Sequence, residues 1–177
     1  MFKVVVTGPE STGKTEICQF LAASFKTGFI PEYAREYIAS LNHPYTIEDV
    51  EKIAQMQVDQ LRQHQEKKLP ILFLDTYLII TKIWFREVYG IIPDWIDRRL
   101  ADAGIDLFLL CYFDIDWIPD PVRENPGYRR AFLYESYRKE IEQLGKPCEV
   151  INGSGTERFE RARMAVEKHF NHFSNKP

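Results

Sequence analysis

The sequence predicts an α/β fold in which a five-stranded parallel sheet is flanked by helices. Five apolar runs of strand length alternate with segments of helical periodicity, which is the pattern of successive β-α units. Two of these runs, Ile71 to Leu74 and Leu107 to Leu110, are apolar at every position, as expected of strands that helices cover on both faces. A glycine-containing loop follows the first run directly, so the first β-α unit is the expected place for a binding loop.

The composition is that of one soluble globular domain over residues 1–177. The chain has 177 residues, of which 45% are hydrophobic and 28% are charged, and its formal net charge is −3. This charge argues against a broad nucleic-acid-binding surface, and no apolar run approaches the roughly 18 residues of a membrane span. The first residues read as a buried strand without a secretory cleavage site. We therefore expect a cytoplasmic protein that binds neither nucleic acid nor membrane, whereas the oligomeric state is not indicated.

Local signals place the individual elements. Strands are expected over residues 3–7, 28–31, 71–75, 107–112 and 148–151. Thr46 and Asp49 resemble a capping box that opens a long helix, which Pro70 ends. Pro93 suits the first turn of a further helix that stops near Gly104. Two more helices are expected from residue 127 or 128 to 144 and from residue 156 to 170.

Most cysteine, histidine and aromatic side chains are predicted to be structural. The cysteines are odd in number and far apart, so we expect reduced thiols in the core at Cys18, Cys111 and Cys148. The four histidines form no ligand pair with a third partner, and no metal role is assigned to them. Aromatic residues at strand or helix positions are expected in the core: Phe20, Phe73, Phe108, Phe159 and Trp84.

The strongest functional signal is the segment Gly8-Pro9-Glu10-Ser11-Thr12-Gly13-Lys14-Thr15, which matches the motif G-x-x-x-x-G-K-[ST] in full. Its glycines allow backbone N–H groups to point at phosphate oxygens, and the helix that follows adds its positive end. Lys14 can span the β- and γ-phosphates, and the Thr15 hydroxyl can bind a Mg²⁺ ion that bridges them. The sequence therefore predicts a P-loop NTPase whose ATP-binding residues are Gly8, Glu10, Ser11, Thr12, Gly13, Lys14 and Thr15.

Asp75 ends the third predicted strand after four apolar residues, which is the Walker B pattern of a carboxylate held near Mg²⁺. Thr76 follows it, where ATP-driven motors commonly place a glutamate that activates water, so a motor is disfavoured. The chain also lacks the N-K-x-D motif of guanine recognition, which disfavours a GTPase. Phosphoryl transfer from ATP to a small acceptor remains, with Thr15 and Asp75 as the residues expected at the metal.

Two further segments are predicted to complete a nucleoside or nucleotide kinase-like site. Glu32 ends the second strand, and its carboxylate can orient the acceptor hydroxyl and accept its proton late in a largely dissociative transfer. The loop before the next-to-last helix holds three prolines and three arginines, and it suits a lid over residues 117–131. Arg123 is the arginine expected to meet the charge of the migrating group. The predicted catalytic residues are thus Lys14, Glu32 and Arg123, and the alternative for the last two is a solvated surface position.

Trp117 and Tyr33 are aromatic residues in predicted loops, each beside a candidate catalytic group. A planar ring at such a place can stack on a flat base, and especially on a cationic base through its negative π face.

The chain resembles the ribosylnicotinamide kinase domain of NadR-type proteins over nearly its whole length. The resemblance rests on the order of four motifs: the P-loop, Glu32-Tyr33-x-Arg35-Glu36, Asp75-Thr76 and Trp117-x-x-Asp120-x-x-Arg123. It implies ATP-dependent phosphorylation of nicotinamide riboside to nicotinamide mononucleotide in NAD synthesis, with Mg²⁺, and it matches Gln57 to a family glutamine near the substrate. The motifs and the resemblance together predict a substrate site formed by Glu32, Tyr33, Arg35, Gln57, Asp75 and Trp117.

Tyr77 departs from the family pattern, in which the third strand tends to be followed as Asp-Thr-Asp or Asp-Thr-Asn, so the base contact is expected to differ. The adenylyltransferase domain of the bifunctional proteins does not fit in this length, and only the kinase step is expected. Two alternatives stay open. One is a kinase for another nucleoside or small alcohol, and the other is an ATP-binding regulatory module whose lid a partner senses. An acid facing the γ-phosphate favours an enzyme, whereas an apolar plug there favours the module.

Overall fold

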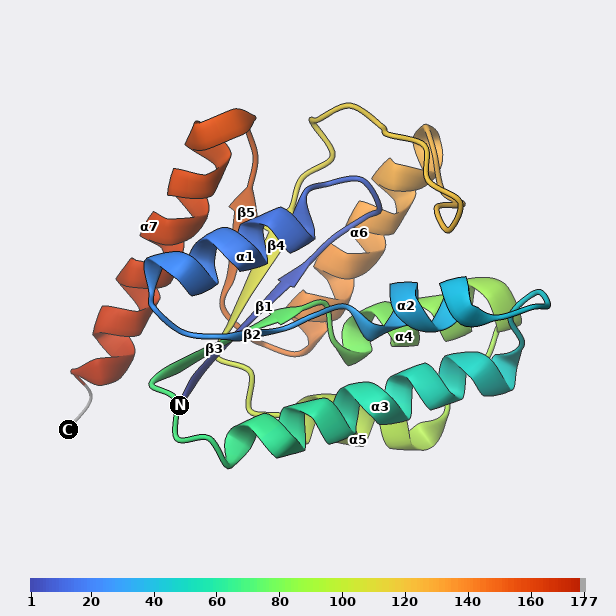
Figure 1. The fold of residues 1–177 in the computed structure, drawn as a ribbon, viewed down its shortest axis with the longest axis horizontal. Coiled ribbons are helices and arrows are strands. Elements are labelled where there is room, and N and C mark those ends of the chain that lie inside the picture. Colours follow the sequence, from blue (N-terminus) through green and yellow to red (C-terminus); the bar gives the residue numbers. More distant parts are fainter. Residues whose placement is uncertain (176–177) are drawn as a thin grey trace.

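Five parallel strands form the central sheet of the computed structural model, which describes residues 1–175 (Figure 1). They are β1 (Phe2–Thr7), β2 (Phe29–Ile30), β3 (Ile71–Asp75), β4 (Leu107–Cys111) and β5 (Cys148–Ile151). Their order across the sheet is β2-β3-β1-β4-β5, and every neighbouring pair is parallel. The predicted fold class is confirmed, and each predicted strand agrees with the observed one to within one residue at either end.

Helices cover both faces of the sheet. They are α1 (Lys14–Ser24), α2 (Tyr33–Ser40), α3 (Ile47–Gln65), α4 (Leu78–Trp84), the π-helical turn η1 (Phe85–Tyr89), α5 (Asp94–Asp102), α6 (Tyr128–Gln143) and α7 (Gly155–Ser174). In Figure 1 α1 and α7 lie together on one side of the strands, whereas α3 to α6 lie on the other. The chain therefore forms three layers, with the sheet in the middle.

Alternate side chains of the central strand separate two apolar cores. Val4 and Val6 of β1 pack in a cluster with Leu21 of α1, and all three are fully buried. Val5 points to the other face and packs in a second cluster, which includes Ala54 of α3. Because both faces are covered, the accessible part of the sheet is the end of its strands, and ligands of open parallel sheets bind at the carboxyl end.

Several details of the helices differ from expectation. Tyr33, expected in a loop, is the first residue of α2, which buries Ala34 but carries no apolar stripe long enough to predict a helix. Pro93 is the N-cap residue before α5 and does not lie in its first turn. The last helix continues past residue 170 to Ser174, where the Phe173 ring packs 5.2 Å from the Phe2 ring of β1. These boundaries depend on tertiary contacts that a local pattern does not contain.

The predicted capping box is present. The Thr46 backbone N–H donates to the Asp49 carboxylate at 2.9 Å, and the Asp49 N–H donates to Thr46 Oγ1 at 3.4 Å.

Burial of the predicted core residues agrees with expectation in part. Cys18 and Cys111 are buried, but Cys148 is exposed because β5 is an edge strand. Phe73 and Phe108 are buried, while the Phe20 and Phe159 rings are partly buried and pack against each other at 5.2 Å. Within residues 1–175, no helix has the length and apolarity to cross a membrane, and no group of three or more His, Cys, Asp and Glu residues is suited to a metal ion.

A buried charge cluster joins the helices on the α3–α6 side. The Glu140 carboxylate of α6, 2% exposed, lies 2.5 Å from Lys82 Nζ of α4 and also pairs with Arg86 of η1. Lys82 pairs in turn with Asp97 of α5 at 2.7 Å. Because a buried charge that loses its partner is strongly destabilising, this cluster fixes how α4, η1, α5 and α6 meet.

We predict that Glu140→Gln lowers the free energy of unfolding by about 3 kcal/mol, because two cations lose their buried carboxylate. Glu142→Gln is the matched control, since this exposed residue of the same helix pairs with Arg138 only at the surface and should change stability by about 0.5 kcal/mol or less. Urea unfolding followed by circular dichroism measures both. Equal small losses in the two variants would show that the cluster does not hold the helices.

Candidate functional site

The loop between β1 and α1 forms a cradle at the carboxyl end of the sheet. Gly8 has a φ of +137°, and a Cβ atom there would lie 2.7 Å from the Cys111 carbonyl oxygen of β4, so a side chain is not accommodated. Ser11 and Gly13 also have positive φ values, of 55° and 74°. Such left-handed residues let successive backbone N–H groups surround an anion, and Lys14 then opens α1 with its positive end at the loop.

Lys14 is 9% exposed and lies in the cradle. Its Nζ atom donates to the Pro9 carbonyl oxygen at 3.0 Å, and Thr12 Oγ1 donates to the same oxygen at 2.8 Å. Both hydrogen bonds stay within the loop, so the ammonium group is held where the motif predicts phosphate oxygens.

Two arginines from distant helices hold the outside of the loop. Arg130 of α6 donates to the Ser11 carbonyl oxygen at 2.9 Å, and Arg158 of α7 donates to the Thr12 carbonyl oxygen at 3.0 Å. Arg158 also pairs with Asp114 at 2.7 Å. Sequence reasoning missed Arg158, because an arginine in the first turns of the last helix belongs to no local motif. These arginine hydrogen bonds to the Ser11 and Thr12 carbonyl oxygens stabilise the conformation of the loop without a ligand.

Thr15 and Asp75 meet where α1 begins and β3 ends. Thr15 Oγ1 donates to Asp75 Oδ2 at 2.5 Å, whereas Asp75 Oδ1 is buried and has no hydrogen-bond partner in the described part of the chain. Burial, with the nearby Glu32 charge as the second cause, raises the pKa of Asp75 to about 6. A hydroxyl beside a buried carboxylate with a free oxygen fits Mg²⁺, which prefers oxygen ligands and keeps several of its waters.

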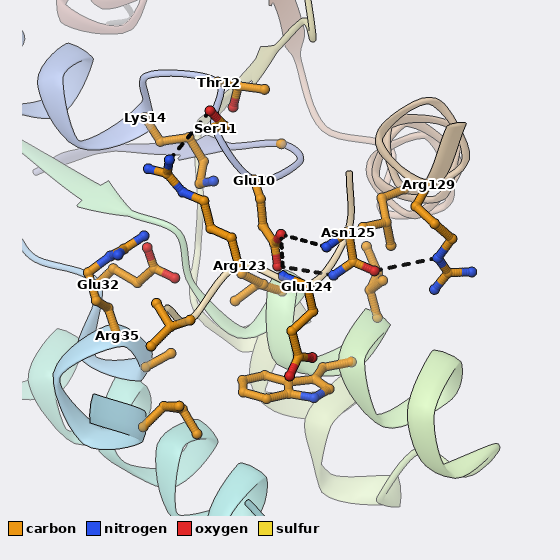
Figure 2. A pocket seen from close by; sticks show the side chains of 18 of the residues that line it. Glu10, Ser11, Thr12, Lys14, Glu32, Arg35, Arg123, Glu124, Asn125 and Arg129 are labelled. Carbon is orange, nitrogen blue, oxygen red and sulfur yellow. Dashed lines mark hydrogen bonds between the residues drawn. The ribbon is translucent and has the colours of Figure 1, made fainter. Parts of the chain in front are cut away.

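A cavity of about 440 Å³ extends from the cradle to α2, α4, α6 and the lid. Lys14 and Thr15 line it on the P-loop side, and Glu32 lines it from the N-cap position of α2. Figure 2 shows Glu32 and Arg35 on the side of the cavity across from the P-loop residues. The structure therefore brings the three predicted catalytic residues, Lys14, Glu32 and Arg123, to one cavity.

Four of the predicted substrate residues do not line this cavity, contrary to expectation. The Tyr33 ring packs on the next turn of α2 because the helix begins at this residue. Trp117 lies with its ring 5.9 Å from the Arg130 guanidinium carbon. Gln57 is 5% exposed, and its amide oxygen accepts a hydrogen bond from a threonine hydroxyl of α4 at 3.3 Å. Asp75 is 3% exposed and accepts its hydrogen bond from Thr15, which does line the cavity.

Tyr45 and Trp84 form an aromatic wall of the cavity that the sequence analysis does not predict. Their rings meet edge to face with centroids 4.8 Å apart, and both residues line the cavity. Trp84 was expected in the core from its helical spacing with Ile80 and Val88. That spacing identifies one face of the helix but not what covers it, and here the face opens on the cavity at the start of η1.

The predicted lid is folded onto the P-loop through Glu10. The Glu10 carboxylate accepts hydrogen bonds from the backbone N–H groups of Glu124 and Asn125 at 3.0 and 2.9 Å, and from the Asn125 side-chain amide at 3.0 Å (Figure 2). The Glu10 side chain is thus directed to the lid, and the prediction that Glu10 binds ATP concerns its place in the P-loop backbone. The last predicted lid residues, 128–131, belong to α6.

Further lid contacts reach both sides of the cavity. Ile118 N–H donates to Ser11 Oγ at 2.9 Å, and an Arg123 guanidinium nitrogen lies 3.5 Å from the same hydroxyl while it donates to the Ile118 carbonyl. On the opposite side, Arg35 of α2 pairs with Asp120 at 2.7 Å. The lid therefore bridges the P-loop and α2.

These features define a P-loop nucleotide-binding protein with the sheet order of nucleotide kinases. The chain belongs to the AAA domain family, whose sequence profile matches residues 3–158.

The fold is similar to two structures of NadR protein. One, in complex with NAD and AMP-PNP, has a TM-score of 0.74 and 26% identity over 96% of this chain and 49% of that chain. The other, in complex with NR, has a TM-score of 0.74 and 24% identity over 96% of this chain and 50% of that chain. The chain thus spans about half the length of the NadR chains it matches.

Two kinases share the fold at lower identity. Thymidylate kinase from Ehrlichia chaffeensis has a TM-score of 0.64 and 15% identity over 94% of this chain and 97% of that chain. Deoxyadenosine kinase from M. mycoides has a TM-score of 0.59 and 12% identity over 99% of this chain and 100% of that chain.

The pKa of Asp75 makes a prediction about stability. Because the pKa is about 6 in the folded chain and 3.8 for an ordinary aspartate, the folded state binds the proton more tightly. This contribution is complete below about pH 4 and is lost as the pH rises through about 6. Asp75→Asn imitates the protonated form at every pH. The free energy of unfolding of this variant, relative to that of the wild type, should therefore rise by about 2 kcal/mol as the pH is raised from about 4.5 to about 8. Urea unfolding in EDTA measures this, and a pH-independent difference would contradict it.

Removing the Glu10 side chain should release the lid. Three hydrogen bonds to one carboxylate join the P-loop to Glu124 and Asn125, and a loss of about 1–2 kcal/mol shifts the closed-to-open ratio about 5- to 30-fold. Glu10→Ala should therefore speed tryptic cleavage after Arg123 by about 5-fold or more with little change in melting temperature. Glu16→Ala is the control, because this residue of α1 also lines the cavity but forms no hydrogen bond or ion pair with lid residues 117–131. Unchanged cleavage in Glu10→Ala would show that other contacts close the lid.

Proposed function

We propose that this protein is an ATP-dependent kinase that phosphorylates nicotinamide riboside to nicotinamide mononucleotide. The observation that carries the proposal is that Lys14 of the P-loop, Glu32 of α2 and Arg123 of the lid all line one cavity. The similarity to NadR structures, at 24% and 26% identity, supports the choice of nucleoside.

On the donor side, the P-loop N–H groups and Lys14 would bind the phosphates of ATP. Thr15 and Asp75 would hold Mg²⁺, directly or through water, and the bound ion supplies positive charge to the β- and γ-phosphate oxygens. Lys14 has to exchange the Pro9 carbonyl for a phosphate oxygen, which is a favourable change because the new hydrogen bond is charge-assisted on both sides.

On the acceptor side, Glu32 would orient the ribose hydroxyl toward the γ-phosphorus and accept its proton late in the transfer. The transition state of phosphoryl transfer is largely dissociative, so positioning matters more than the strength of the base. Arg123 would stabilise the charge on the transferring group, and Arg35 would position the lid through Asp120.

The flat base of the acceptor would pack against the wall formed by Tyr45 and Trp84. This assignment replaces the predicted stacking on Trp117 and Tyr33, because those rings do not line the cavity. Tyr77, which departs from the family pattern, is 3% exposed in the core and would make no contact with the substrate.

One observation bears on the alternatives. An acid in the cavity supports an enzyme over a regulatory module, since Glu32 stands where a module would carry an apolar plug. A kinase for another nucleoside shares every residue of the donor side, and only the acceptor tells the two apart.

A nucleoside screen with ATP and Mg²⁺, read as ADP release and as mass gain of the acceptor, tests the proposal. Nicotinamide riboside should be the preferred acceptor, and Lys14→Ala should show no turnover while it keeps the wild-type circular dichroism spectrum. Preference for a purine or pyrimidine nucleoside would show that the proposed substrate is wrong. If no nucleoside were phosphorylated, the proposed kinase activity itself would be wrong.

Glu32→Gln should lower kcat by at least about 10²-fold while the dissociation constant of ATP stays nearly constant, because the amide keeps the shape but cannot accept the proton. Glu36→Gln, an exposed acid one turn along the same helix, serves as control and should retain kcat. If ATP affinity fell together with kcat in Glu32→Gln, the residue would have to act in metal or nucleotide binding instead.

A further inference from the structure

The acceptor half of the cavity has an anionic side chain next to its aromatic wall. The hydroxyl of Tyr45 donates to Glu124 Oε2 at 2.9 Å, and the Tyr45 ring in turn packs on Trp84. All three residues line the cavity. In Figure 2 the Glu124 side chain points away from Glu10, although its backbone N–H donates to that residue. The lid therefore carries a carboxylate to the wall where the base of the acceptor is expected.

Other charged side chains around this wall have partners of their own. Glu87 of η1 pairs with Arg86, whose Nε atom lies 3.3 Å from the Glu87 carboxylate. The Arg129 guanidinium lies over the Phe132 ring at 5.0 Å and near the Asn125 side chain. Glu124 forms no ion pair within residues 1–175, although Arg123 and Arg129 line the same cavity, so its carboxylate is available to pair with a cationic ligand.

Tyr45 keeps this carboxylate in place. Burial, and then the hydrogen bond to Glu124, raises the pKa of Tyr45 to about 12, so the phenol stays protonated and remains a donor. The edge-to-face contact with Trp84 restrains the Tyr45 ring. Glu124 and Trp84 line the same cavity and both contact Tyr45, so the wall can offer a flat cation both a negative charge and a π surface.

We propose that Glu124 is a specificity-determining residue that selects acceptors with a positively charged base. This inference rests on the proposed function and deepens it: a cationic ring would lie against Trp84 and be paired by Glu124 once the lid closes. The same pairing would make the stability of the closed lid depend on the acceptor, because the Glu124 carboxylate gains a partner of opposite charge only when a cationic base is bound. A neutral base gains the aromatic contact alone.

The test compares nicotinamide riboside with benzamide riboside, a neutral analogue of the same shape. The ratio of their kcat/KM values in Glu124→Gln should fall about 5-fold or more below the wild-type ratio, while turnover of the neutral analogue changes little. Tyr45→Phe should lower the ratio less, because the carboxylate stays but loses its anchor. Glu135→Gln removes the same charge from an exposed pair with Arg138 on α6 and should leave the ratio unchanged.

The outcomes separate this inference from the proposed function. If the wild type phosphorylates nicotinamide riboside but Glu124→Gln keeps its ratio, or if Glu87→Gln lowers the ratio in its place, Glu124 does not select the charge. Calorimetric titration of both ribosides in the presence of a non-hydrolysable ATP analogue gives a readout without turnover. If the wild type binds the cation no more tightly than the neutral analogue, the inference is overturned whatever the activity. If neither riboside is phosphorylated but the cation still binds more tightly, the kinase proposal fails and the charge selection stands.

Discussion

The close approach of the P-loop to β4 is the constraint on which the site depends. Gly8 lies so close to the Cys111 carbonyl oxygen that there is no room for a side chain. The P-loop therefore packs directly against the end of the neighbouring strand. The chain leaves β4 at this point and runs into the lid. One backbone contact thus places the lid beside the cradle, and the hydrogen bonds from the lid to Glu10 and Ser11 follow from that proximity.

The polar groups of the cradle are divided between two tasks. Arg130 and Arg158 bind loop carbonyls from outside, and they come from helices far along the chain. Because these carbonyls are already engaged, the loop can keep its left-handed turns without help from a ligand. The shape of the binding loop is therefore a property of the whole domain, in particular of how α6 and α7 pack against the sheet.

The acidic groups in and beside the cavity are also separated from one another. Asp75 is buried near Glu32, and both the burial and the Glu32 charge raise its pKa. The ionised carboxylate is therefore destabilised in the folded chain, and a bound cation would relieve this destabilisation. The opposite end of the cavity has an aromatic wall and one lid carboxylate, Glu124. A basic centre between the two, formed by Lys14 and Arg123, is where transferred phosphate charge would be stabilised.

The sequence by itself determined the parallel sheet, its five strands, the P-loop and the acid at the end of β3, because a pattern of neighbouring residues predicts each of them. It also brought Glu32 to attention, since the end of a parallel strand lies at the ligand-binding edge. Only the tertiary structure decided that Tyr45 and Trp84, and not Trp117 and Tyr33, line the cavity. The physical reason is that a helical period defines a face, whereas packing between distant segments decides whether that face meets the core, a cavity or solvent.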